Sequence, residues 1–199
     1  MKRIDALHAL AAVTAGEDLF IGSVGPTRDD WWNVRPDRTA GAHNTFSPAI
    51  LGSVAPTALG LALVLPQRRV IAIDTDGSML MNLGALCTLG AERPGNLTVA
   101  VLDNEIYESS GGQPTHTALG ADLARIAEAA GCINCSTVDD PDDLSARAAQ
   151  LLDDGEFGFV VAKIEPGVHR WPEERRRPFD GIEDKYRFRR HIASVEHHS

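Results

Sequence analysis

The fold of this chain is decided by two short stretches, Val70-Ile71-Ala72-Ile73-Asp74-Thr75-Asp76-Gly77-Ser78 and Leu97-Thr98-Val99-Ala100-Val101-Leu102-Asp103-Asn104. Each begins as an apolar run rich in β-branched residues and ends at oxygen-bearing side chains. Such runs are typical of buried parallel strands. The carboxyl ends of parallel strands share one edge of a sheet, where open α/β sheets bind ligands. We therefore expect Asp76 and Asn104 to lie close together at that edge.

The residue types at these two strand ends suit a metal ion and a phosphate. A carboxylate and a carboxamide are good ligands for Mg²⁺, which often completes its shell with water and phosphate oxygens. Gly77 and Ser78 open the helix expected after the first strand, with Ser78 as its cap. The free N–H groups and the positive dipole end of a helix favour an anion. The sequence therefore predicts a site for a metal ion and a diphosphate.

The rest of the chain alternates between helical and strand patterns. Repeated strand–helix–strand units predict a parallel sheet with right-handed crossovers, and hence a three-layer α/β/α domain. We expect this domain to span residues 1–165, followed by a C-terminal arm or tail at 166–199. Residues 105–117 form a polar segment with paired glycines, which predicts a mobile loop. Helices are expected at 2–15, 29–34, 49–65, 78–91, 122–130 and 142–153, and strands at 19–21, 70–74, 97–102, 133–138 and 157–164.

Composition excludes several functional classes. The net charge of −9 argues against a nucleic-acid-binding surface, which would be basic. No apolar run reaches the ~18 residues of a membrane span, and the N-terminus lacks the pattern of a signal peptide. Three cysteines cannot form a disulfide framework. We therefore expect a cytoplasmic protein with neither a nucleic-acid nor a membrane partner.

The two strand-end motifs resemble a known family signature. The diphosphate-binding domain of thiamine-diphosphate enzymes carries Gly-Asp-Gly, then some 25 residues, then Asn-Asn. Here the corresponding residues are Thr75-Asp76-Gly77, 25 intervening residues and Asp103-Asn104. The sequences of residues 76–86, 101–104 and 108–115 are most similar to those of phosphonopyruvate decarboxylases and sulfopyruvate decarboxylase β subunits. The resemblance covers roughly residues 17–165 and implies the thiamine-diphosphate-binding fold.

The resemblance implies a metal and a cofactor, Mg²⁺ and thiamine diphosphate. Asp76 and Asn104 would bind the metal through side-chain oxygens, and Ile106 through its carbonyl. Gly77 and Ser78 would meet the diphosphate through backbone amides.

Further contacts with the cofactor are implied by two other segments. Gly22 and Ser23 resemble the family's first cofactor loop. Gly52, Ser53 and Val54 resemble the segment whose bulky apolar residue bends the cofactor, a role that falls to Val54. Tyr107 matches an aromatic position beside the cofactor. The catalytic residues expected on this basis are Val54, Tyr107 and His116, with Glu108, Ser109 and Ser110 also bordering the substrate.

Three positions depart from the family pattern. Thr75 replaces a glycine, and a β-branched residue excludes backbone angles that glycine allows. Glu105 replaces the glycine of close relatives and would add charge beside the metal. Val54 is smaller than the Met, Leu or Ile that usually bends the cofactor.

The function implied is that of one subunit of a split thiamine-diphosphate-dependent decarboxylase acting on a small 2-oxo acid. The family activates its cofactor with a glutamate on a second, pyrimidine-binding domain. One sheet accounts for almost all of this chain, so a separate subunit should supply that domain. We expect a hetero-oligomer of at least α2β2 composition.

Other interpretations of the same residues remain. The chain could be a cofactor-binding or regulatory subunit without turnover. Asp74 and Asp76 also resemble the nucleophile and general acid of haloacid-dehalogenase-type phosphatases, although no lysine lies between Asp76 and the acidic pair at 139–140. The Asp76-Gly77 pair could also be a simple strand-to-helix turn.

Several further motifs favour structural roles. Cys132 and Cys135 lie in a predicted strand, and ordinary packing is the favoured interpretation of the pair. Adjacent tryptophans at 31–32 favour an interface, where tryptophan is enriched. His43, like His116, lies in a polar loop and is a candidate for proton transfer.

Overall fold

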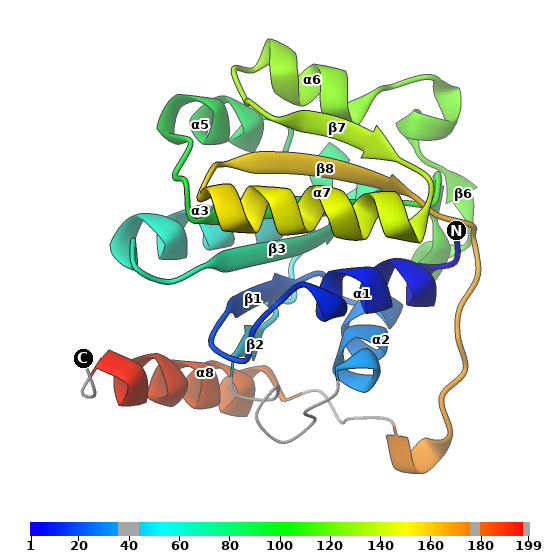
Figure 1. Ribbon diagram of the computed structural model, residues 1–199. Helices are drawn as coiled ribbons and strands as arrows, with labels where there is room; N and C mark the ends of the chain where they lie inside the picture. The colour runs from blue at the N-terminus through cyan, green and yellow to red at the C-terminus, as the bar shows by residue number, and fades with distance from the viewer. Residues whose placement is uncertain (36–43, 176–179, 197–199) are drawn as a thin grey trace.

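The computed structural model describes residues 1–35, 44–175 and 180–196 and has a parallel sheet at its centre (Figure 1). Six strands lie in the order β2-β1-β3-β4-β8-β7, and every neighbouring pair is parallel. The register of the two central strands pairs Thr75 with Leu102, so that Asp76 and Asp103 follow side by side at the carboxyl edge. The strands are β1 (Leu19–Gly22), β2 (Thr45–Phe46), β3 (Val70–Thr75), β4 (Leu97–Asp103), β7 (Cys135–Val138) and β8 (Gly158–Lys163).

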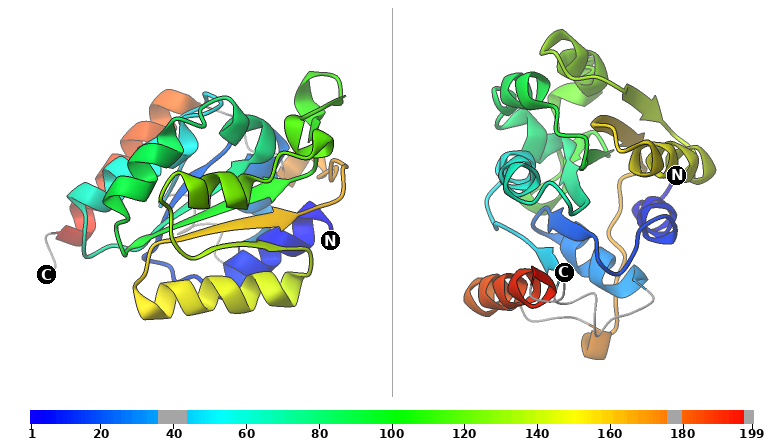
Figure 2. Two further views of the ribbon diagram at one scale, coloured as in Figure 1. Left: turned by 90° about the horizontal axis from the view of Figure 1, so that it is seen from above. Right: turned by 60° about the vertical axis from the view of Figure 1, so that its left-hand side comes forward.

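Helices cover both faces of the sheet, which confirms the predicted three-layer α/β/α architecture (Figure 2). One buried cluster joins the sheet to α1 (Arg3–Ala12), α2 (Pro26–Val34) and α7 (Pro141–Asp154). The other cluster joins the opposite face to α3 (Val54–Val64), α5 (Ala85–Glu92) and α6 (Leu123–Ala129). Both faces are therefore dry, as a parallel sheet requires. No helix in the described part of the chain combines the length and the hydropathy that a membrane span needs.

Two of the predicted helices differ from the observed ones in ways that affect the site. The helix expected at 49–65 begins only at Val54, because Ala49 and Gly52 have φ of +60° and +79°, outside helical geometry. The helix expected at 78–91 is two helices, α4 (Asp76–Leu80) and α5, separated by a turn that contains Asn82 and Gly84. Asparagine and glycine are poor helix formers. The N-cap of α4 is Thr75, so the prediction that Ser78 caps this helix is wrong.

Only one residue of the tryptophan pair lies in the core, since Trp32 is half-buried, and an interface role for the pair stays a prediction. Proline at the first position starts α2 three residues earlier than expected. Trp31 is buried beneath this helix, with its ring centroid 4.7 Å from that of Phe20. Trp31 therefore belongs to the core of the domain.

Residues 105–117 form a small hairpin rather than an irregular loop. Strand β5 (Ile106–Tyr107) pairs with antiparallel β6 (Gln113–Pro114), and the short 3₁₀ segments η1 (Glu108–Ser110) and η2 (His116–Leu119) follow each strand. Gly111 and Gly112 turn the chain with φ of +116° and +74°, values that only glycine adopts without strain. Mobility of this hairpin stays a prediction.

The C-terminal segment packs onto the domain. Helix α8 (Gly181–Glu196) follows the short η3 (Glu173–Arg175) and lies against β2, where the Phe188 and Phe46 ring centroids are 5.7 Å apart. Phe188 is buried in the same cluster as α3. The boundary at residue 165 stays a prediction, but α8 covers the β2 edge of the sheet.

The predicted strand at 133–138 begins only at Cys135. Asn134 has φ of +52° and lies between the two cysteines, so they do not share a strand. Both thiols are free, as is that of Cys87.

Candidate cofactor-binding site

A cavity of about 150 Å³ lies at the carboxyl edge of β3 and β4. It brings together residues that are far apart in the sequence and that were predicted to share a site. The predicted residues that line it are Asp76, Gly77, Ser78, Asn104, Ile106 and Tyr107.

Asp76 is a buried carboxylate with one oxygen left open. Its exposed fraction is 1%, and its Oδ2 accepts a hydrogen bond from Thr115 Oγ1 at 2.7 Å. Its Oδ1 has no hydrogen-bond partner among the described residues. Burial raises the pKa of Asp76, while the Thr115 hydroxyl opposes that rise. A buried carboxylate oxygen without a donor is costly, and a bound cation would satisfy it.

Two further oxygens lie on the next segment. Asn104 is buried, and its Oδ1 accepts only a long 3.3 Å contact from the Ile106 amide. Pro114 is the cross-strand partner of Ile106 and has no amide hydrogen to give to the Ile106 carbonyl. Mg²⁺ prefers oxygen ligands, and Asp76, Asn104 and Ile106 each offer one here. The described residues contain no group of three or more His, Cys, Asp or Glu side chains that could hold a metal.

Small residues bring backbone close to the cavity. A Cβ atom added to Gly77 would lie 2.7 Å from the Tyr107 ring, so only glycine fits under that ring. A Cβ on Gly52 would lie 2.9 Å from Asn82 Cβ. The Gly52 amide donates to Ser78 Oγ at 2.9 Å, and its carbonyl accepts from Asn82. The turn before α3 is therefore fastened to α4.

Leu51 is among the apolar residues that line the cavity, whereas Val54 does not line it. Val54 is 1% exposed and packs in the core between α3 and the sheet. Leu51 is 40% exposed and lines the cavity. The choice of Val54 followed from placing the whole segment in one helix, and its role at the cofactor stays a prediction. The signal in the sequence that could have placed Leu51 at the cavity was its position directly before a glycine in a turn.

Other predicted site residues lie beside the cavity without lining it. Gly22 ends β1 and Ser23 follows it, but Val24 is the residue of that loop that lines the cavity. Gly52 and Ser53 follow Leu51 in the chain and do not line the cavity. His116 is exposed between the buried Thr115 and Thr117, does not line the cavity, and its catalytic role stays a prediction. His43 lies outside the described residues.

The two glycine replacements are accommodated without disrupting the site. Thr75 has φ of −126° and ψ of 157°, an extended conformation open to any residue. Glu105 has φ of +64°, a backbone conformation that glycine adopts most readily. Its carboxylate forms an ion pair with Lys163 at 2.5 Å, and Lys163 also binds Asp103 at 2.9 Å. The extra charge of Glu105 is thus neutralised by Lys163.

A buried guanidinium fixes the start of the hairpin. Arg3 donates to Asp30 Oδ2 at 2.8 Å, to Glu108 Oε2 at 2.7 Å and to the Gly167 carbonyl at 2.8 Å. Glu108 Oε1 in turn accepts from the Gly167 amide, and Trp171 donates to Asp30. Arg3 lines the cavity, yet nothing in its sequence context indicated a place there.

Asp74 is buried beneath the site and cannot serve as an exposed nucleophile. It is 1% exposed and accepts from the Thr75 amide at 2.9 Å. Burial raises its pKa to about 6, against hydrogen bonds from Ser78 and Thr75. This burial removes the geometry that a phosphatase of the haloacid-dehalogenase type needs.

The raised pKa predicts a pH-dependent stability. Because folded Asp74 holds its proton more tightly than the unfolded chain does, the free energy of unfolding should fall as pH rises from about 4 to about 6. Asp74→Asn should remove this loss, which is on the order of 3 kcal/mol. Urea unfolding of the metal-free chain on both sides of this pH range would measure it. Parallel pH profiles for the unmodified chain and the variant would contradict the prediction.

Comparison with known proteins agrees with the geometry. Residues 30–162 match the model of the thiamine pyrophosphate enzyme C-terminal TPP binding domain; thiamine pyrophosphate (TPP) is thiamine diphosphate. The chain is 30% identical over 165 residues to sulfopyruvate decarboxylase subunit beta of Methanocaldococcus jannaschii, covering 83% of this chain and 85% of that subunit. It is 37% identical over 168 residues to phosphonopyruvate decarboxylase of Streptomyces viridochromogenes, covering 83% of this chain but 40% of that enzyme.

Solved structures agree at the level of the fold. Benzoylformate decarboxylase from Polynucleobacter necessarius superposes with a TM-score of 0.70 at 16% identity, covering 86% of this chain and 34% of that chain. The family match covers more than half of this sequence and includes both strand-end motifs. The chain therefore belongs to the thiamine pyrophosphate enzymes, as a C-terminal-type TPP-binding domain.

Proposed function

We propose that this chain is the diphosphate- and Mg²⁺-binding subunit of a split thiamine-diphosphate-dependent 2-oxo acid decarboxylase, a carbon–carbon lyase. The observation that carries this proposal is the unpartnered, buried Oδ1 of Asp76 next to Asn104. The family match supplies the cofactor that such a site would hold. The residues present fit that group, because the oxygens that they offer are ligands that Mg²⁺ prefers. Gly77 fits as well, since a Cβ atom at this position would meet the Tyr107 ring beside the cavity.

The residues of this chain would bind and orient the cofactor. When bound, thiamine diphosphate supplies the electron sink that lets a 2-oxo acid lose carbon dioxide. Asp76, Asn104 and the Ile106 carbonyl would hold the metal that anchors the diphosphate. Leu51 would support the bent shape of the cofactor, the role predicted for Val54. Tyr107 and Glu108 would border the substrate.

A second subunit is part of the proposal. The cavity of about 150 Å³ is smaller than the roughly 300–1,000 Å³ of pockets that enclose whole ligands, so another surface must cover most of the cofactor. The chain spans most of a relative named as a subunit but less than half of the phosphonopyruvate decarboxylase. A separate pyrimidine-binding subunit, in a hetero-oligomer of at least α2β2, would complete the site. The free cysteines of this chain support a cytoplasmic location for the enzyme.

The substrate we propose is a small 2-oxo acid. The named relatives act on sulfopyruvate and phosphonopyruvate, which share the 2-oxo acid group and differ in their second anion. The test is co-expression with a pyrimidine-binding partner and a screen of 2-oxo acids for carbon dioxide release with Mg²⁺ and thiamine diphosphate. If a complex that binds the cofactor releases carbon dioxide from none of these acids, this result would favour a non-catalytic, regulatory subunit.

The roles of Leu51 and Val54 can be separated by a matched pair of variants. Leu51→Ala should lower turnover strongly and leave the unfolding free energy within about 0.5–1 kcal/mol, because Leu51 is partly exposed. Val54→Ala should instead lower stability by about 1–3 kcal/mol, because it leaves a cavity in the core. Assays of the assembled enzyme and urea unfolding would distinguish the two. The reverse pattern would restore Val54 as the residue that contacts the cofactor.

A further inference from the structure

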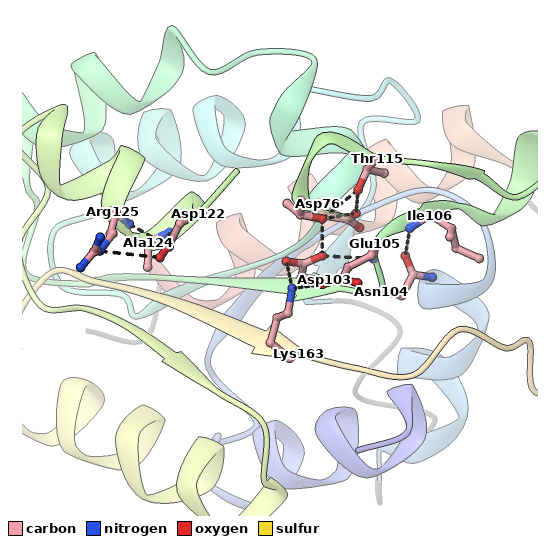
Figure 3. Close-up of polar contacts among 11 residues, drawn as sticks. Asp76, Asp103, Asn104, Glu105, Ile106, Thr115, Asp122, Ala124, Arg125 and Lys163 are labelled. Atoms are coloured by element: carbon pink, nitrogen blue, oxygen red, sulfur yellow. Dashed lines mark hydrogen bonds and ion pairs between the residues drawn. The ribbon is translucent and has the colours of Figure 1, made fainter. Parts of the chain in front are cut away.

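Two buried threonine hydroxyls connect Asp76 to the adjacent strand. Thr115 Oγ1 donates to Asp76 Oδ2 at 2.7 Å and lies 2.8 Å from Thr117 Oγ1, which donates to Asp103 Oδ1 at 2.8 Å. The exposed fractions of Thr115 and Thr117 are 0% and 6%, and neither residue lines the cavity. Figure 3 shows Thr115 close to Asp76, with Asp103 and Lys163 following on the strands beneath. Asp76 is thus held from within the protein and not by solvent.

The far end of this connection is anchored by an ion pair. Asp103 Oδ2 accepts from Lys163 Nζ at 2.9 Å, while Oδ1 accepts from the Glu105 amide at 3.1 Å as well as from Thr117. Both oxygens of Asp103 are therefore engaged within the protein. Asp103 serves as a fixed acceptor for Thr117, and Asp76 is the carboxylate with an open oxygen.

The near end fixes the direction of that open oxygen. Thr115 holds Oδ2 of Asp76, and Oδ1 has no partner. A carboxylate held through one oxygen cannot rotate freely, so the other oxygen keeps one orientation. Residues that orient a metal ligand in this way typically change metal affinity 10–100-fold when they are replaced.

Thr115 also holds the segment that carries the other two expected ligands. Its backbone amide donates to the Glu105 carbonyl at 2.8 Å, between Asn104 and Ile106. The strand before Thr115 pairs with the strand that contains Ile106. One residue therefore fixes Asp76 through its side chain and the 104–106 segment through its backbone.

We propose that Thr115, backed by Thr117, is a positioning residue that presents Asp76 Oδ1 to Mg²⁺ and keeps it in register with Asn104 and Ile106. This inference rests on the proposed function, because it concerns the same metal site. It assigns the hydroxyl of Thr115 a role distinct from packing.

The test compares Thr115→Val with Thr115→Ser. Valine keeps the shape of threonine and lacks the hydroxyl, whereas serine keeps the hydroxyl. In the complex with its partner subunit, thiamine diphosphate binding is measured by calorimetry across a series of Mg²⁺ concentrations. Thr115→Val should raise the Mg²⁺ concentration for half-saturation at least about 10-fold, and Thr115→Ser should stay within about three-fold of the unmodified protein. Thr137→Val, an exposed position on β7, is the matched control and should change nothing.

The outcomes separate this inference from the proposed function. If the unmodified complex binds no thiamine diphosphate at any Mg²⁺ concentration, the proposed function fails and the inference fails with it. If the unmodified complex binds and Thr115→Val needs no more Mg²⁺, the positioning role alone is overturned. Equal losses in the valine and serine variants would also overturn it, because they would indicate packing. Unfolding of the metal-free variants, measured in parallel, corrects for any general loss of stability.

Discussion

Replacement of Asp76 by alanine is expected to abolish thiamine diphosphate binding by the assembled enzyme, with a loss of more than about 100-fold in affinity. Among the described residues of the cavity wall, Asp76 supplies the one carboxylate oxygen that has no partner, and Mg²⁺ without it would keep only neutral ligands from these residues. Asn104→Ala should weaken binding less, by about 10–100-fold, because a water molecule can replace a neutral oxygen. Calorimetry with Mg²⁺ and thiamine diphosphate measures both changes.

The Asp76 variant should remain folded, which makes its loss of binding interpretable. Removing a buried carboxylate with an open oxygen relieves a desolvation cost, but it also takes the acceptor away from the buried Thr115 hydroxyl. These effects oppose each other, so the unfolding free energy of the metal-free chain should change by no more than about 1–3 kcal/mol. Asp153→Ala, which removes an exposed carboxylate on α7, is a suitable control. Unchanged affinity in both the Asp76 and Asn104 variants would refute the metal site.

The isolated chain is expected to be catalytically inactive, and activity is expected only with the partner subunit. The family activates its cofactor through a glutamate against the aminopyrimidine ring. In the cavity described here the glutamate is Glu108, and both of its carboxylate oxygens are held by Arg3 and Gly167. No glutamate among the cavity-lining residues of the described chain is therefore free for that task.

Exchange of the C2 proton of the cofactor, followed by NMR, measures this step directly. The reconstituted complex should accelerate the exchange by several orders of magnitude over the isolated chain at the same cofactor concentration, an effect of the size that general acid–base catalysis contributes. A complex with Asp76→Ala in this chain serves as a control for unbound cofactor. Equally fast exchange by the chain alone would disprove the split-enzyme proposal.

The sequence correctly indicated the residues that lie together directly after neighbouring strands. Asp76 and Asn104 each end a buried apolar run, so the edge they share could be inferred from pattern alone. The same logic predicted both helical layers and the parallel sheet. These features depend on residues near one another in the chain.

The errors arose where backbone geometry or distant contacts decide the outcome. Leu51 was missed because the start of α3 depends on two residues with positive φ, Ala49 and Gly52, and alanine gives no such signal. Helix α8 was missed because its apolar face is completed by β2, far away in the sequence. Arg3 and Thr115 were missed because a polar residue in a local pattern does not identify its distant partner.

The contacts of Arg3 have a consequence for how the protein folds. Its three partners, Asp30, Glu108 and Gly167, lie 27, 105 and 164 residues away along the chain. Closing a long loop costs chain entropy before the contact that closes it has formed. Contacts over such distances are therefore expected to form late in folding. The contacts that Gly167 makes with Arg3 and Glu108 can form only after β8 has been synthesised, because Gly167 follows that strand in the chain. A nascent chain that ends before β8 would have both strand-end motifs and still lack a formed wall of the cavity, so cofactor binding would report on completed folding.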